Sequence, residues 1–184
     1  MNKSGGQMVS IRVNPSKAGQ RTTNNEQQEK VPWSSNGYYL PQRPSFTLDP
    51  LFHAGAYYVQ EASSMFLEEV IKQTVDLSKP IKVLDLCAAP GGKSTLIQSI
   101  ISKESLLVSN EVIKTRVNIL SENITKWGAA TVIVTNNDPP DFQRLPNYFD
   151  LIVVDAPCRG NGLFRHKPKA IVECSEKNLT LCAH

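Results

Sequence analysis

The sequence has 184 residues, of which 40% are hydrophobic and 20% charged, and its formal net charge is +3 at pH 7. This composition excludes a collagen-like chain and an acidic disordered one, and the length suits one domain of ordinary size. No apolar run approaches the roughly 20 residues that cross a bilayer, and the first residues lack the apolar core of a secretory signal. We therefore expect a soluble, cytoplasmic protein without a membrane partner, whose mild positive charge permits an anionic one.

The first 59 residues are predicted to form part of an N-terminal domain followed by an extended linker. Val9–Val13 alternates like a strand, whereas residues 18–30 are almost entirely polar and have little to bury. Residues 31–50 contain prolines separated by aromatic side chains, which indicates an extended connecting segment. Regular structure is therefore expected to begin near Gln60.

Residues 60–184 are predicted to form a second domain in which strands and helices alternate. Apolar runs predict strands at 81–87, 106–110, 131–135 and 149–155, and helical spacing predicts helices at 61–75, 93–102 and 113–127, the last capped by Gly128. Continuously apolar strands separated by helices indicate a parallel sheet with helices on both faces, so the predicted fold class is α/β, doubly wound and Rossmann-like. Because the sequence ends soon after the fourth strand, we expect this domain to be incomplete at its C-terminus.

Acidic residues recur where the predicted strands end. Asp85 and the glycine loop of residues 87–93 follow the first strand, and Glu111, Asp138 and Asp155 follow the next three. In an open α/β sheet, ligands bind at the carboxyl ends of the strands. One acidic residue could be a helix cap, but recurrence at successive strand ends indicates a binding site.

Two ligands are compatible with the glycine loop. Residues 92–94 resemble the end of a phosphate-binding P-loop, but that motif needs glycine where this chain has Cys87, and Pro90 removes a backbone amide. Glu111 stands where a carboxylate accepts hydrogen bonds from a ribose diol, and Asp138 could accept one from an adenine amino group. An adenosine cofactor without a pyrophosphate, S-adenosylmethionine, therefore fits better than the nucleotide of a phosphohydrolase.

Residues 83–94 and 155–162 resemble the two signature motifs of the Nop/Sun family of RNA cytosine-C5 methyltransferases. Residues 53–65 resemble the segment just before that family's catalytic core, and residues 10–15 are similar to its N-terminal domain. The resemblance implies a class I methyltransferase fold, S-adenosylmethionine as methyl donor, and ribosomal or transfer RNA as substrate. It identifies residues 60–184 as the N-terminal part of the catalytic domain. The cofactor-binding residues that it implies are Cys87, Ala88, Ala89, Pro90, Gly91, Gly92, Lys93, Glu111, Asp138 and Asp155.

The predicted catalytic residues are Asp155 and Cys158. C5 of cytosine is a weak nucleophile, but a thiolate that adds at C6 raises its electron density, and a carboxylic acid at N3 eases that addition. These residues alone favour Cys158 as the attacking thiol. The family resemblance implies instead that Cys158 assists product release, while the nucleophile belongs to a Thr-Cys motif after the next strand. Since neither Cys174 nor Cys182 follows a threonine, we expect the nucleophile in a missing C-terminal part, and the alternative is a binding fragment without turnover.

A basic segment beside these residues is predicted to bind RNA through Arg159, Phe164, Arg165 and Lys167. Arginine and lysine contact phosphates, and an aromatic ring stacks on an unpaired base. A solvated basic loop would explain the same residues. The histidines and cysteines lack the spacing of metal ligands, so we expect no metal.

Overall fold

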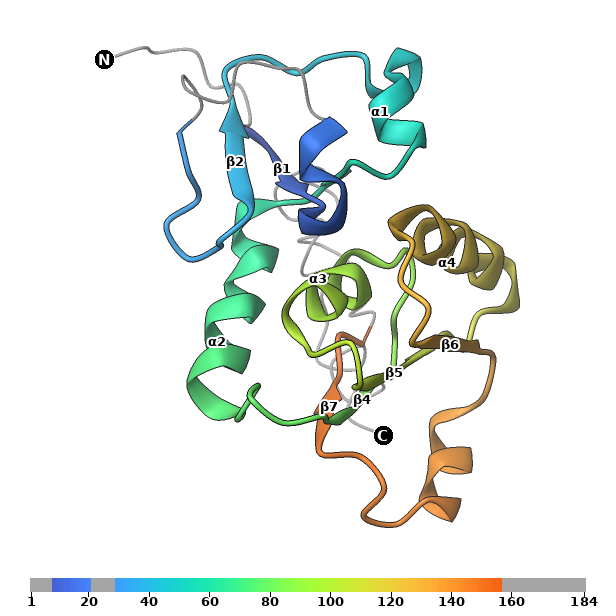
Figure 1. Ribbon diagram of the computed structural model, residues 1–184. Helices are drawn as coiled ribbons and strands as arrows, with labels where there is room; N and C mark the ends of the chain where they lie inside the picture. The colour runs from blue at the N-terminus through green and yellow to red at the C-terminus, as the bar shows by residue number, and fades with distance from the viewer. Residues whose placement is uncertain (1–7, 21–28, 157–184) are drawn as a thin grey trace, which may run out of the picture. The chain divides into compact units, whose positions relative to one another are not determined.

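The computed structural model describes residues 8–20 and 29–156 (Figure 1). Two compact units divide the chain, 1–154 and 155–184, and the described part of the second consists of Asp155 and Ala156. All of the helices and strands described below belong to the first unit. Within the described residues, no helix has both the length and the hydropathy that crossing a membrane requires.

An antiparallel sheet forms the N-terminal part of the first unit. Its strands are β1 (Val9–Val13), β2 (Gly37–Leu40) and β3 (Tyr57–Val59), in the spatial order β2-β1-β3. Short helical segments accompany the strands at Pro15–Gln20, Phe46–Leu48 and α1 (Pro50–His53). Ile11 of β1 is paired with Tyr38 on one side and with Val59 on the other.

The strand predicted at Val9–Val13 is confirmed, but the expectation that regular structure begins near Gln60 is wrong. β2, α1 and β3 all precede that residue, and β2 lies within residues 31–50, the segment that we expected to be an extended connection. Local sequence does not reveal β2 and β3, because each is short and is stabilised by pairing with β1. The domain boundary after residue 59 stays a prediction.

The second sheet contains four parallel strands, β4 (Lys82–Asp85), β5 (Leu106–Asn110), β6 (Val132–Thr135) and β7 (Leu151–Val153). Their spatial order is β6-β5-β4-β7, so the chain leaves β4 towards β5 and returns to β7 on the other side of β4. The accompanying helices are Ala62–Phe66, α2 (Leu67–Thr74), α3 (Gly92–Ile100), α4 (Lys114–Trp127) and Pro139–Arg144. This arrangement confirms the predicted α/β, Rossmann-like fold.

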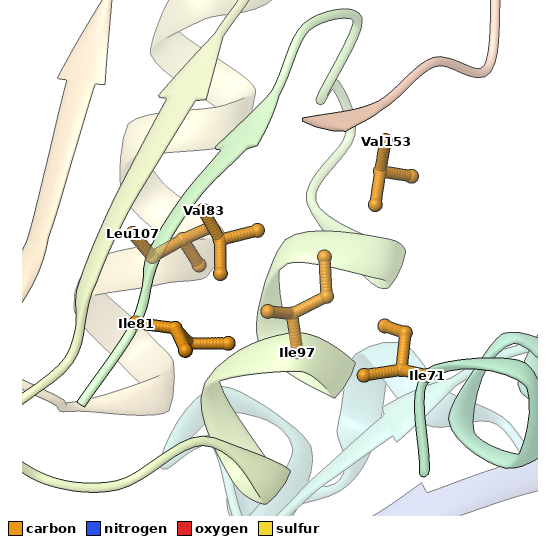
Figure 2. Close-up of a cluster of buried hydrophobic side chains, with 6 residues drawn as sticks. All are labelled: Ile71, Ile81, Val83, Ile97, Leu107 and Val153. Atoms are coloured by element: carbon orange, nitrogen blue, oxygen red, sulfur yellow. The ribbon is translucent and has the colours of Figure 1, made fainter. Parts of the chain in front are cut away.

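The main hydrophobic core lies between this sheet and its helices. Figure 2 shows its side chains, which come from α2, from α3 and from three neighbouring strands or their first flanking residue: Ile71, Ile81, Val83, Ile97, Leu107 and Val153. Ile97 of α3 is 0% exposed. Burying a side chain of this size contributes about 1.5–3 kcal/mol, so this core holds α2 and α3 against the parallel sheet.

The described helices cover one face of the parallel sheet. α4 packs on Val132, which is the register partner of Leu107 and therefore lies on the same face as the main core. The opposite face carries Leu84, which is 1% exposed, and Ile152, which is 55% exposed. The prediction of helices on both faces is therefore confirmed for one face. For the second face, the prediction falls on residues outside the described part of the chain.

Two local predictions have mixed outcomes. Gly128 ends α4 in the left-handed conformation with φ 89°, as predicted. Along the helical segments at 62–74, Met65 and Ile71 are buried as expected from their spacing, but Phe66 and Val70 are 51% and 43% exposed. The predicted apolar face is interrupted because Ala62–Phe66 is a 3-10 helix. Its turn contains three residues, so its side chains do not follow the 3.6-residue spacing on which the prediction rested.

Candidate functional site

The glycine loop lies at the carboxyl end of the central strand β4. Its backbone is tied to both neighbouring strands, because the Leu86 amide donates to the Val153 carbonyl at 2.9 Å and the Ala88 amide to the Asn110 carbonyl at 2.7 Å. Gly91 of the loop has φ 112° and forms the N-cap of α3. Residues with a side chain rarely adopt this conformation, so the turn from β4 into α3 requires glycine there.

A buried carboxylate fixes where α3 begins. Asp85, at the end of β4, is 0% exposed and accepts a hydrogen bond from the Ser94 hydroxyl at 2.7 Å. The Ser109 hydroxyl of β5 donates in turn to Ser94 at 2.8 Å. This chain of bonds joins two strand ends to the first turn of α3, and it makes Asp85 a support of the loop.

Glu111 reaches back from the end of β5 to the glycine loop. Its Oε2 accepts a hydrogen bond from the Ala89 amide at 3.2 Å, and its Oε1 accepts one from the Ile113 amide at 2.9 Å. The structure therefore brings Glu111 and the loop together, as sequence reasoning predicted. Glu111 is 3% exposed.

Arg116 is a residue of this site that sequence reasoning missed. Its Nη1 lies 3.5 Å from Oε2 of Glu111, and its Nη2 donates to the Ala89 carbonyl at 2.6 Å. Both backbone groups of Ala89 are thus engaged by the Glu111–Arg116 pair. The sequence signal that could have found it is an arginine in the first turn of the helix that follows the acidic residue.

Asn110 connects the ends of three strands, and it too was missed as a site residue. It is 0% exposed, and its Nδ2 donates to the carbonyls of Leu86 at 3.1 Å and Asn137 at 3.0 Å. Its Oδ1 accepts from the Asn137 amide and the Thr135 hydroxyl, both at 2.9 Å. Because a backbone amide can only donate, these bonds also set the orientation of the Asn110 side chain.

Asp138 follows β6 and is exposed. Its side chain caps the short helix Pro139–Arg144 in a reciprocal capping box with Asp141. The bond between Asn110 and the carbonyl of Asn137 anchors the preceding residue beside β5. Asp138 is thus held at the strand end where it was predicted, but its carboxylate is engaged as a helix cap.

The remaining predicted residues divide between the loop and the second unit. Cys87 and Lys93 are half-buried members of the loop, and Asp155 belongs to the second compact unit. The other predicted residues lie outside the described part of the chain: Cys158, Arg159, Phe164, Arg165 and Lys167. Among residues 8–20 and 29–156, no three His, Cys, Asp or Glu side chains form a group that could hold a metal.

Comparison with known protein families gives two matches. Residues 72–184 match the family described as 16S rRNA methyltransferase RsmB/F, and residues 3–62 match the N-terminal domain of 16S rRNA methyltransferase RsmF. The ribosomal RNA small subunit methyltransferase F of Pectobacterium atrosepticum is 37% identical over 161 residues, which are 84% of this chain and 32% of the relative. The chain therefore spans about a third of the length of the curated relatives it matches.

Solved structures agree with the fold. A methyltransferase homolog from Pyrococcus horikoshii is 29% identical with a TM-score of 0.72, and the match covers 92% of this chain and 56% of that one. NSun6 from Pyrococcus horikoshii, solved with the ligand SFG, is 28% identical with a TM-score of 0.54 and covers 64% of this chain and 30% of its own. Both likenesses support the Rossmann-like fold of the parallel sheet β4–β7 and its helices.

Proposed function

Because the chain belongs to the RsmB/F family of 16S rRNA methyltransferases, we propose that it binds S-adenosylmethionine as part of an enzyme that methylates C5 of a cytosine in ribosomal RNA. The observation that carries this proposal is the hydrogen bond between the Glu111 carboxylate and the Ala89 amide. It puts the predicted ribose acceptor directly on the predicted cofactor loop. A cytoplasmic location belongs to the same proposal, because that is where a bacterial enzyme meets ribosomal RNA.

The residues at these strand ends fit the chemistry of this cofactor. Residues 87–93 would hold its methionyl end at the N-terminus of α3, where the first amides of a helix and its dipole favour a carboxylate. Glu111 would accept hydrogen bonds from the ribose hydroxyls, and Val112, which is 37% exposed, offers an apolar surface for the adenine ring. Asp138 would accept a bond from the adenine amino group, and Asp155 is proposed as the acidic residue after β7.

The chemistry is assigned to Asp155 and Cys158. When bound, the cofactor supplies an electrophilic methyl group. Asp155 would hold a proton at N3 of the cytosine, and the Cys158 thiolate would either attack C6 or, as the family resemblance implies, release the methylated product. Arg159, Phe164 and the basic residues after them would contact the RNA strand. Residues 1–59 are proposed as a separate, partial N-terminal domain.

Isothermal calorimetry with S-adenosylmethionine tests the cofactor site. We expect Glu111→Gln to weaken binding about 10- to 100-fold, because a hydrogen bond to a charged group is worth about 1.5–3 kcal/mol. Glu104→Gln is the matched control, since Glu104 is exposed in the turn before β5 and should bind like the unaltered chain. A folded chain that does not bind the cofactor, or a Glu111→Gln variant that binds equally well, would refute the assignment.

Methyl transfer tests the reaction itself. Ribosomal RNA incubated with the protein and tritiated S-adenosylmethionine should carry label at C5 of a cytosine. Cofactor binding without transfer would support the alternative of a binding fragment that lacks the nucleophile. Label at another position of the nucleotide would refute the proposed chemistry.

A further inference from the structure

A buried arginine of the N-terminal sheet contacts the first turn of the helix that follows the glycine loop. Arg12 of β1 is 1% exposed. Its Nη2 donates to the Thr95 hydroxyl at 2.6 Å and to the Gly92 carbonyl at 3.2 Å, while its Nη1 donates to the Thr95 carbonyl and the Ser99 hydroxyl, both at 3.2 Å. One guanidinium therefore holds two successive turns of α3, starting at the last glycine of the motif.

The other side of the guanidinium is held as firmly. Its Nε donates to Oε1 of Gln60 at 2.8 Å, and its Cζ lies over the Trp127 ring, 4.5 Å from the ring centre. Gln60 is itself joined to β1, because its carbonyl accepts a bond from the Ser10 hydroxyl at 2.6 Å. These contacts leave Arg12 little freedom, so its position is set by three separate elements of the first unit.

The glycine loop and the end of β3 are in close contact at this point. A Cβ atom placed on Gly92 would lie 3.3 Å from Cε1 of Tyr58 and 3.6 Å from Nε2 of Gln60. Gly92 is thus enclosed between β3 and the Arg12 guanidinium. Any shift of Arg12 would move the backbone at the point where α3 begins.

Arg12 is also a buried charge whose direct contacts in the described residues are hydrogen bonds to neutral groups and a cation–π contact. Burial lowers its pKa to about 9, against the opposing influence of Tyr58 and Glu68, so the guanidinium stays charged at neutral pH. Within the described part of the chain, no carboxylate forms an ion pair with it. A buried cation without such a partner is unfavourable, and a bound anion nearby would relieve this.

We propose that Arg12 is a positioning residue for the cofactor, because it holds the first turn of α3 where the carboxylate of the methionyl group binds. The N-terminal sheet, through Arg12 of β1, then helps to form the cofactor site. This inference rests on the proposed function, since it requires S-adenosylmethionine at the glycine loop. It predicts that Arg12 influences the methionyl end of the ligand and leaves the adenosine end alone.

The test compares two ligands on one variant. Arg12→Lys keeps the charge but cannot make the five-donor fork, so it should weaken S-adenosylmethionine about tenfold, the loss of one charge-assisted hydrogen bond. Methylthioadenosine lacks the amino acid part and should bind the variant as it binds the unaltered chain. The ratio of the two dissociation constants is therefore the measured quantity, and a purely structural role would weaken both ligands alike.

Asn14→Ala is the matched structural control. Asn14 joins the same segment to the end of α4, donating to the carbonyls of Trp127 at 2.9 Å and Gly55 at 3.0 Å, and among the described residues its side chain makes no hydrogen bond to α3. Its loss should lower the melting temperature and leave the ratio of the dissociation constants unchanged. An equal change of the ratio in Asn14→Ala and Arg12→Lys would overturn the proposal.

A second variant decides the question if Arg12→Lys does not fold. Thr95→Val removes the hydroxyl that accepts the 2.6 Å bond while preserving the shape of the side chain. It should shift the ratio in the same direction, and an unchanged ratio in a folded Thr95→Val variant would refute the inference. If the unaltered chain binds neither ligand, the proposed function is refuted. That result differs from a refutation of the Arg12 inference, in which the unaltered chain binds both ligands and the variants leave the ratio unchanged.

Discussion

Replacing Asn110 with aspartate tests whether one side chain holds the strand ends of the site together. The change preserves size and leaves an oxygen to accept the two 2.9 Å bonds from Asn137 and Thr135. It replaces the amide donor with a second oxygen, which then faces the carbonyls of Leu86 and Asn137 at about the former 3.1 and 3.0 Å. Two hydrogen bonds thus become oxygen–oxygen repulsions at residue 110, whose native side chain is 0% exposed.

The structure allows the magnitude to be worked out. Each lost hydrogen bond contributes about 0.5–1.5 kcal/mol net, and a buried carbonyl left without a donor costs about 1–3 kcal/mol, a cost that applies to half-buried Leu86 more than to exposed Asn137. Allowing for relaxation, we expect Asn110→Asp to lower the free energy of unfolding at pH 7 by about 3–5 kcal/mol. At pH 5 the loss should be smaller, because burial and the neighbouring carbonyls favour the protonated acid, which can donate one bond.

Urea denaturation followed by tryptophan fluorescence measures this loss. Asn118→Asp is the control, since Asn118 is exposed on α4, and it should change stability by less than about 0.5 kcal/mol. The reasoning is refuted if Asn110→Asp behaves like the control, or if its destabilisation is equal at the two pH values. Calorimetry on the folded variant should also show weaker cofactor binding, because Asn110 anchors the residue before Asp138.

Three other substitutions have defined outcomes. Burial alone raises the pKa of Glu68, but hydrogen bonds from Lys72 and nearby groups outweigh the effect of burial and lower the pKa below its usual value. The charged Glu68 carboxylate therefore stabilises the fold at neutral pH, and this contribution is lost as the pH falls below about 4.5. Glu68→Gln should flatten the acid side of the unfolding profile, and an unchanged profile would contradict this account. Gly55→Ala should destabilise by more than about 3 kcal/mol in a urea titration, because Gly55 has φ 69° and its new Cβ would collide with the Lys126 carbonyl. Ile97→Ala should cost about 2–5 kcal/mol in the same assay, and a loss under 1 kcal/mol would show that the core relaxes.

The sequence by itself determined the parallel sheet and the position of the glycine loop. The strand predicted at 106–110 coincides with β5, and Gly128 caps α4 as expected. Both predictions rest on local sequence, because a strand buried on both faces is mostly apolar, as the first three residues of β5 are, and because a left-handed residue after a helix is most easily glycine. That Glu111 lies beside the glycine loop could be predicted as well, because parallel strands end at one edge of the sheet.

Only the tertiary structure decided how this edge is held together. Arg12 lies 80 residues before Gly92, to which it donates, and Asn110 lies 27 residues before Asn137. β2 and β3 likewise exist because β1 pairs with both of them. A buried polar side chain or a short strand is stable only when distant partners satisfy its hydrogen bonds, and those partners cannot be identified from the neighbouring residues in the sequence.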